Sequence, residues 1–216
     1  MLFFQPSSLN ATRITASAYG ILVGFASMEH GIFEILQGNV RPGSILIDAI
    51  GPGHKIWEGA SESAITVIPN FLITGILAML MGLIIILWSC RFIKRKYGVL
   101  IFSLLVIIQL LVGGGIAPIL IAILAIIAAI RIDKPHTWWK THIPAVITKF
   151  LAIIWPLCFI AFILLFFIVV EIGIFGWFFG VSDPSNILAT LPYYMMIPMV
   201  LAVPAAIGYD IQKKTE

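Results

Sequence analysis

Several apolar stretches of this chain are long enough to cross a lipid bilayer as helices, and they limit the fold more than any other feature. A hydrocarbon layer of ~30 Å takes about 20 helical residues. Because backbone N–H and C=O groups must pair internally in lipid, such stretches predict α-helices. Apolar residues make up 61% of the chain and charged residues 11%, whereas a soluble domain has about 25% charged residues. The sequence therefore excludes an ordinary soluble domain.

The pattern predicts an all-α fold, a polytopic bundle of transmembrane helices that forms a single integral membrane domain over residues 1–216. The second helix is expected to begin after Gly53 and to end near Cys90. Because it is longer than the bilayer is thick, its first turns either extend beyond the bilayer or bend at Pro69. About six membrane segments are expected, at residues 14–36, 64–90, 98–112, 117–130, 145–170 and 191–209.

The apolar run Tyr97–Ile130 is broken by three glycines, Gly113–Gly115, and permits two topologies. One long helix would separate the basic loops that flank it, with five Lys and Arg residues inside and eight outside. Two short helices that turn at the glycines would leave only Arg41 and Lys55, of 13 basic residues, outside. Since Lys and Arg concentrate in cytoplasmic loops, we predict a short glycine-broken hairpin, with the N and C termini both cytoplasmic.

The polar stretch Met28–Glu62 stands out between the apolar runs because it holds two His-x-x-x-Glu turns. His30 and Glu34 form the first turn, and His54 and Glu58 form the second. Helical periodicity places each pair on one helix face. Ionisable groups within a membrane span are costly and usually functional, so we expect the two turns to meet at the outer ends of neighbouring helices. The predicted ligand or proton site comprises Glu29, His30, Glu34, Gln37, His54, Glu58 and Glu62.

The residue types at these turns point to a metal ion or a proton. Imidazole nitrogen with carboxylate oxygen suits a divalent metal such as Zn, Mn or Fe, and His titrates near neutral pH. Glu29 points about 100° away from His30 on a helix and need not share its site. The structural alternatives are a solvated turn around His54 and a simple hydrogen bond from His30 to Glu34 or Glu58. The predicted metal ligands are His30, Glu34, His54 and Glu58.

Small residues mark two places where we expect close helix packing. Ala16, Gly20 and Gly24 recur at four-residue spacing, a pattern that lets another helix approach closely. The three glycines after residue 112 are expected to permit a tight turn. The alternative is that their backbone groups line a pocket, as in the broken helices of transporters. The residues predicted to serve helix packing are Ala16, Gly20, Gly24, Gly113, Gly114 and Gly115.

Three functional hypotheses follow from these patterns. The first is a multi-pass membrane protein that binds a small ligand, metal ion or proton at an outer-side His/Glu site, for transport or sensing. The second is a membrane-embedded metalloenzyme acting on a lipid or quinone-like substrate, and the third is a non-catalytic membrane subunit or assembly factor. The expected location is the cytoplasmic membrane of a prokaryote, in contact with the lipid bilayer. The expected protein partners are further copies of the chain, as a homo-oligomer, or a partner membrane subunit. No pattern for nucleic-acid binding is present, and the sequence leaves open whether the protein is an enzyme.

Overall fold

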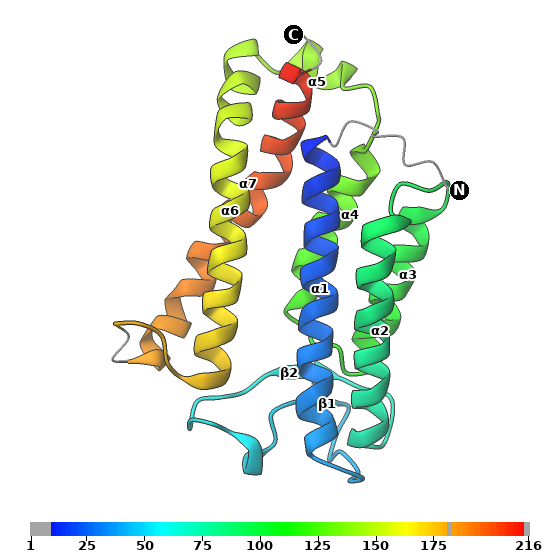
Figure 1. The fold of residues 1–216 in the computed structure, drawn as a ribbon, viewed down its shortest axis with the longest axis vertical. Helices are drawn as coiled ribbons and strands as arrows, with labels where there is room; N and C mark the ends of the chain where they lie inside the picture. The colour runs from blue at the N-terminus through cyan, green and yellow to red at the C-terminus, as the bar shows by residue number, and fades with distance from the viewer. Residues whose placement is uncertain (1–9, 181–182, 214–216) are drawn as a thin grey trace, which may run out of the picture.

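The computed structural model describes residues 10–180 and 183–213. The molecule is mostly helical, with 72% of the described residues in helices. Figure 1 shows the helices side by side in an elongated bundle, and the strands of the described residues form a small hairpin near one end of it. The seven α-helices of the described residues are α1 (Ala11–Leu36), α2 (Phe71–Arg91), α3 (Gly98–Leu111), α4 (Pro118–Arg131), α5 (Thr137–His142), α6 (Ala145–Phe175) and α7 (Pro184–Lys213).

Three of these helices, α2, α6 and α7, are long and apolar enough to cross a membrane. The helices α3 and α4 are also apolar but shorter, at 14 residues each. Helices of this length and composition are typical of membrane proteins, because in lipid the backbone polar groups have to pair within the helix. The prediction of a mostly helical protein of the membrane type is therefore confirmed.

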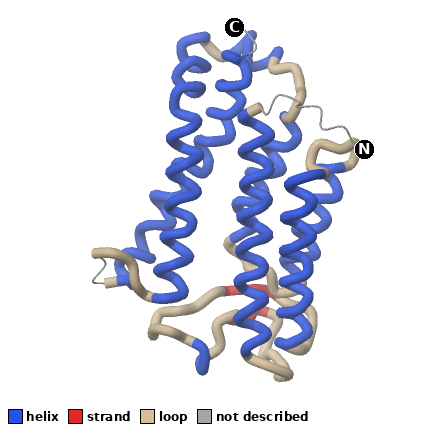
Figure 2. Tube along the Cα trace, in the orientation of Figure 1, coloured by secondary structure: helices blue, strands red, loops and turns tan. Residues whose placement is uncertain are grey.

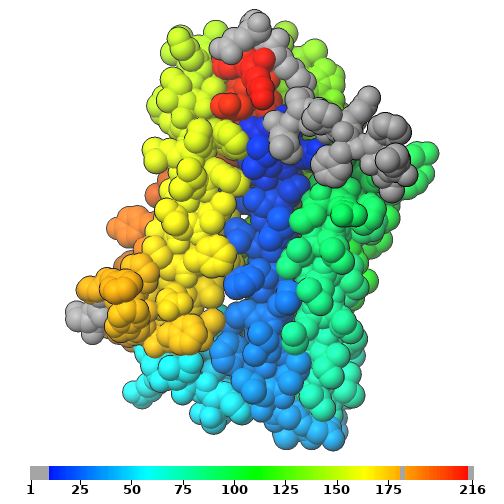
Figure 3. Space-filling model, viewed as in Figure 1, coloured from blue at the N-terminus to red at the C-terminus, as the bar shows by residue number. Residues whose placement is uncertain are grey.

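The helix α1 lies in the middle of the bundle and packs against α2, α4 and α7, while α6 packs mainly on α7 (Figure 1). On the face drawn in Figure 3, α1 forms a strip between α6 and α2. Ala16 and Tyr19 of α1 belong to the hydrophobic core. The Tyr19 ring meets that of Phe162 with 4.7 Å between centroids, and its hydroxyl donates to the backbone oxygen of Met199 at 2.8 Å. The carboxylate of Asp210 in α7 accepts from the first two backbone N–H groups of α1, at 2.7 and 3.0 Å, and so stabilises the start of that helix.

Glycines make the contact between α1 and α2. Gly24 faces Gly82, and Gly31 faces Gly75; a Cβ added to any of the four would lie 2.5 to 2.6 Å from the backbone oxygen of its partner. Without side chains at these positions the two backbones approach closely. Gly20 and Gly24, chosen from their spacing, therefore face another helix of the same chain. Gly31 makes an equivalent contact that the four-residue spacing did not reveal.

The segment that follows Gly53 is not helical, which contradicts the prediction of one long second helix. The helix α2 begins at Phe71, after Asn70, whose side chain accepts a hydrogen bond from a backbone N–H in the first turn. Asn is one of the best residues at this capping position. Pro69 directly before it has no N–H to donate and would interrupt a helix running through it. The proline and the cap together place the helix start well after the predicted one.

The residues before α2 form a hairpin of two short strands instead, seen in Figure 2. Strand β1 (Leu46–Asp48) pairs antiparallel with β2 (Ser63–Ile65), with Ile47 opposite Ala64. A 3-10 turn (Pro52–His54) lies in the connection between the strands. Because the backbone of this segment is paired across a hairpin or turned in a loop, its side chains do not follow helical periodicity. The helix face predicted for residues 54 and 58 does not exist.

The helices α3 and α4 are separate and turn at the three glycines, as predicted. Gly113 and Gly115 have φ angles of +92° and +88°, a conformation that favours glycine. The turn also hydrogen-bonds to the strand hairpin. The N–H of Gly113 donates to the oxygen of Ile65, and the N–H of Val67 donates to the oxygen of Leu111, both at 2.9 Å. The glycine turn and the strands therefore form one connected structure against α1.

Candidate functional site

The last three turns of α1 carry a buried polar face on an otherwise apolar helix. Ser27, His30 and Glu34 are 0%, 3% and 0% exposed, and their spacing of three and four residues places them on one side. Glu29, next to them on the helix, is half-buried. Burying polar groups costs free energy unless they find partners. The surroundings of this face therefore define the candidate site.

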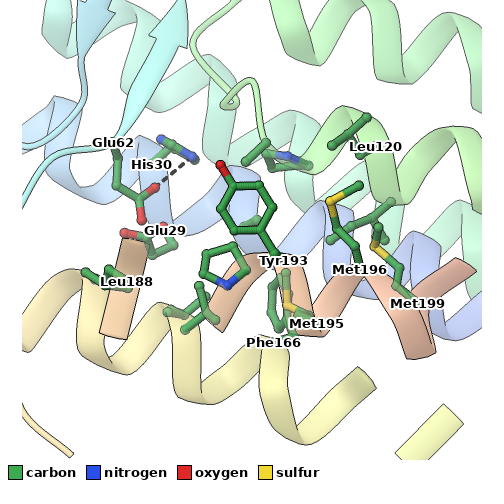
Figure 4. Close-up of a pocket in the computed structure, with 18 of the residues that line it drawn as sticks. Glu29, His30, Glu62, Leu120, Phe166, Leu188, Tyr193, Met195, Met196 and Met199 are labelled. Carbon is green, nitrogen blue, oxygen red and sulfur yellow. Dashed lines mark ion pairs between the residues drawn. The ribbon is translucent and has the colours of Figure 1, made fainter. Parts of the chain in front are cut away.

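Glu62 reaches this face from the strand hairpin. The carboxylate of Asp48 accepts from the backbone N–H of Glu62 at 2.8 Å, which orders the loop just before β2. Gln37, which follows α1, donates to the backbone oxygens of Asp48 and Ala49 at 3.1 and 2.7 Å. These hydrogen bonds tie the hairpin to the end of α1. As a result, Nε2 of His30 and Oε2 of Glu62 lie 2.8 Å apart (Figure 4).

The glycine turn between α3 and α4 lies directly on the same polar face of α1. A Cβ on Gly113 would collide with the carboxylate of Glu34, and one on Gly115 would collide with the ring of His30. Gly114, between them, would meet a buried glutamine side chain of α3 in the same way. Three consecutive glycines thus let the main chain approach α1 where no larger residue fits. This geometry agrees with the close packing expected for the turn.

Glu29, His30 and Glu62 together have the character of a metal-ligand group. One ligand atom from each side chain lies within 4.8 Å of the other two, and no other such group is found among the described residues. Imidazole nitrogen and carboxylate oxygen suit Zn, Mn or Fe, and three protein ligands leave a coordination position for a further ligand. Oε1 of Glu29 and Nδ1 of His30 are buried without a hydrogen-bond partner in the described structure. The arrangement therefore fits a bound cation.

The ionisation of Glu62 also suits a cation site. Burial by itself would raise the pKa of this carboxyl group. The hydrogen bond and the positive charge of His30, together with a hydrogen bond to Glu29, outweigh burial and hold the pKa of Glu62 below its ordinary value. Glu62 is thus the ionised carboxylate of the cluster at neutral pH.

A cavity of about 510 Å³ lies beside this cluster. The volume falls within the range of small-molecule sites. Figure 4 shows the three cluster residues at one end of the cavity and Met196 and Met199 of α7 toward the other, with Tyr193 and Phe166 between them. Most of the remaining lining comes from apolar residues of α4, α6 and α7. The cluster therefore forms the polar end of an apolar cavity.

The structure does not assemble the four predicted metal ligands. His30 is in the observed cluster, but Glu34 lies one turn further along α1, with both carboxylate oxygens buried and unpartnered among the described residues. His54 is half-buried in the 3-10 turn, and Glu58 is exposed. Neither of these two residues lines the cavity or joins the cluster. The two His-x-x-x-Glu turns therefore do not form one group of ligand atoms among the described residues.

The loop geometry explains this difference. Because the chain after Gly53 returns as a strand, it brings Glu62 rather than Glu58 to His30. Glu29 belongs to the cluster as well. The side chain of Glu62 comes from a loop and can therefore approach between the neighbouring residues Glu29 and His30 of α1. Sequence reasoning missed the cavity altogether. The available signal was the Met-rich stretch of α7, because methionine is common at adaptable binding surfaces.

The fold and the site define a helical protein of the membrane type that holds a His/Glu cluster at the end of an apolar cavity. Comparison of the chain with protein-family models, with curated proteins and with solved structures finds no match. The geometry of the site is therefore the basis for inferring the function.

Proposed function

We propose that the protein is a multi-pass membrane protein that binds a divalent metal ion through Glu29, His30 and Glu62. The observation that carries this proposal is the grouping of one imidazole and two carboxylates with ligand atoms within 4.8 Å of one another. The metal would be Zn, Mn or Fe, because the ligand set is nitrogen and oxygen without thiolate. Transport or sensing of the metal, or of a ligand bound through it, is the function that this site supports best.

The electrostatics of the cluster support a cation. Two carboxyl groups next to each other in a largely buried place repel when both are ionised, and His30 offers at most one positive charge. A divalent ion would neutralise both carboxylates. It would also give the buried Oε1 of Glu29 a partner, which it lacks in the described structure. A buried polar atom without a partner calls for such an explanation, because nearly all others in proteins are paired.

The cavity favours a second candidate function, that of a metalloenzyme acting on a lipid or quinone-like substrate. A bound metal of this kind supplies Lewis acidity, which polarises an oxygen of the substrate. The chain's own residues would hold the substrate chain between α6 and α7 and keep water from the cluster. Oε1 of Glu29 is buried and has no hydrogen-bond partner in the described structure, so this carboxyl group is available to exchange a proton with a bound substrate.

We further propose six membrane segments with both termini cytoplasmic, and a location in the cytoplasmic membrane of a prokaryote. The separate helices α3 and α4 support this topology, because they return the chain to the side from which it came. In Figure 1 the start of α1, the α2–α3 connection and the end of α7 lie near one end of the bundle. The strand hairpin, with Arg41 and Lys55 nearby in sequence, lies at the other end. Concentration of the remaining Lys and Arg on one side agrees with the rule for cytoplasmic loops.

Elemental analysis of protein purified without chelator tests the metal site. We expect stoichiometric metal in the wild type and its loss in His30→Ala and Glu62→Gln. His54→Ala is the matched control, because it removes a histidine that the sequence pattern favoured and the structure leaves outside the cluster. Equal metal content in wild type and His30→Ala would refute the proposal. Loss of metal in His54→Ala alone would instead support the metal ligands predicted from the sequence.

A further inference from the structure

The cavity beside the cluster has one polar end and otherwise apolar walls, which restricts the chemistry of its occupant. Phe166 and Val170 of α6 and Met195 and Met199 of α7 line it away from the cluster, together with Leu120 of α4. An occupant with polar groups along its length would lose hydrogen bonds to water that these walls cannot replace. The cavity therefore suits a molecule with an apolar body and one polar end.

The size of the cavity suits a long hydrocarbon chain. Its volume is about 510 Å³, compared with ~150 Å³ for an engineered cavity that binds benzene with its six carbon atoms. By proportion, roughly 20 carbon atoms fill the cavity. This corresponds to a single chain and is too small for a lipid with two long acyl chains.

The exposed residues of the lining show where such a chain enters. Tyr193 and Met196 of α7 line the cavity and are nevertheless 71% and 40% exposed. Both belong to a helix that is long and apolar enough to span a membrane, so this opening faces lipid. A molecule already dissolved in the bilayer reaches the cavity sideways, without passing through water.

The charges at the polar end select an uncharged head group. The two carboxylates of Glu29 and Glu62 together balance the charge of a divalent ion. No Lys or Arg is among the residues that line the cavity in the described part of the chain. An anionic head group, such as a phosphate, would lose its hydration here without gaining a counter-charge, which is costly. A hydroxyl or carbonyl oxygen, in contrast, can complete the coordination of the metal without adding charge.

We propose that the cavity binds an uncharged single-chain lipid, with a hydroxyl or carbonyl oxygen at Glu29, His30 and Glu62 and an apolar chain between α6 and α7. This inference rests on the proposed function, because the oxygen is directed to the metal held by the same three residues. It adds the class of molecule bound and its route of entry. The chain length of about 20 carbon atoms follows from the volume of the cavity.

Native mass spectrometry of the zinc-loaded protein in detergent tests this proposal. The probes are geranylgeraniol, geranylgeranyl phosphate, which has the same chain with a charged head, and decylubiquinone, which has carbonyl oxygens. We expect one molecule of the alcohol or the quinone to bind per chain, and the phosphate to bind at least about tenfold more weakly. Equal or tighter binding of the phosphate would overturn the choice of an uncharged head.

Two variants of α7 test the location. Met196→Trp fills the cavity and is expected to weaken binding of geranylgeraniol at least about tenfold. Ile197→Trp is the matched control, since Ile197 is the next residue, is 58% exposed and does not line the cavity. Unchanged binding by Met196→Trp would refute the site. Metal analysis of the same samples separates the two proposals. Bound metal with no alcohol or quinone bound refutes this inference alone, whereas protein that takes up no zinc refutes the proposed function.

Discussion

Replacing Gly82 with Ala is expected to push α1 and α2 apart. A Cβ at this position would lie 2.5 Å from the backbone oxygen of Gly24, and it would also meet the side chain of Met28 at 2.6 Å. Real Cβ atoms do not come within 3.0 Å of such atoms. The side chain of Met28 can turn away, but the backbone oxygen of Gly24 moves only with its helix. The two helices must therefore separate by up to about 1 Å along this contact.

The cost can be estimated from the lost van der Waals contacts. A local helix contact of about 40 atom pairs at ~0.15 kcal/mol each contributes roughly 6 kcal/mol, and a gap of 0.5–1 Å removes about a quarter to a half of it. The loss is then roughly 1.5–3 kcal/mol, similar to other overpacked sites. Alanine gains about 1 kcal/mol over glycine in helix propensity. The net destabilisation is therefore about 0.5–2 kcal/mol, or about 1–8 °C in Tm for a chain of this size.

The assay is thermal unfolding in mild detergent, followed by the reaction of a thiol dye with Cys158, which is buried in the folded protein. Cys90 is exposed and is replaced with Ser beforehand. The control is Gly173→Ala, because Gly173 is also inside a helix but a Cβ there would meet nothing within 4 Å. We expect Gly173→Ala to have an unchanged or higher Tm. If Gly82→Ala is as stable as Gly173→Ala, the close glycine contact is not part of the folded state.

Three further substitutions and one control variant test other contacts. Asp210→Ala leaves two backbone N–H groups at the start of α1 unpaired and should lower the free energy of unfolding by about 2–4 kcal/mol, measured in the same thermal assay. Gly115→Ala is expected to displace the ring of His30 and to lower zinc affinity at least about tenfold by titration; wild-type affinity would show that the turn does not hold the ring. Asp48→Ala releases the loop that carries the third ligand and should lower zinc affinity about 10–100-fold. Lys55→Ala removes only the partly exposed ion pair of Asp48 and should leave affinity unchanged.

The helices were largely predictable because lipid allows few alternatives. Apolar runs identified α3, α4 and α6 as helices, and the interruption at Gly113–Gly115 identified the turn between α3 and α4. Both inferences depend on local properties, namely hydrophobicity and the conformational freedom of glycine. The start of α2 was not predicted correctly, although Pro69 and Asn70 were visible as a break and a cap. The His-x-x-x-Glu pattern after Gly53 suggested helical periodicity where the chain forms a hairpin.

The site was predicted in part. Its location near His30 followed from the presence of ionisable groups on an apolar helix, which requires only the sequence. The residues that make up the site could not be predicted from the sequence. Glu62 reaches His30 only because β1 pairs with β2 and because the backbone N–H of Glu62 donates to Asp48. Glu29 could not be assigned from helical angles, since its partner comes from a loop. Likewise, the spacing of Gly24 suggested a helix contact without saying which helix lies opposite.

By itself, the sequence determined that the chain forms helices apolar and long enough to span a membrane, that it turns at three glycines and that His30 stands among apolar residues on a helix. These features depend on residues near one another in the chain and on the solvent around them. Only the tertiary structure decided which carboxylates meet His30, that α1 and α2 pack through paired glycines, and that an apolar cavity lies beside the cluster. Each of these depends on distances between residues far apart in the chain, and those distances are set by how the loops and helices pack together.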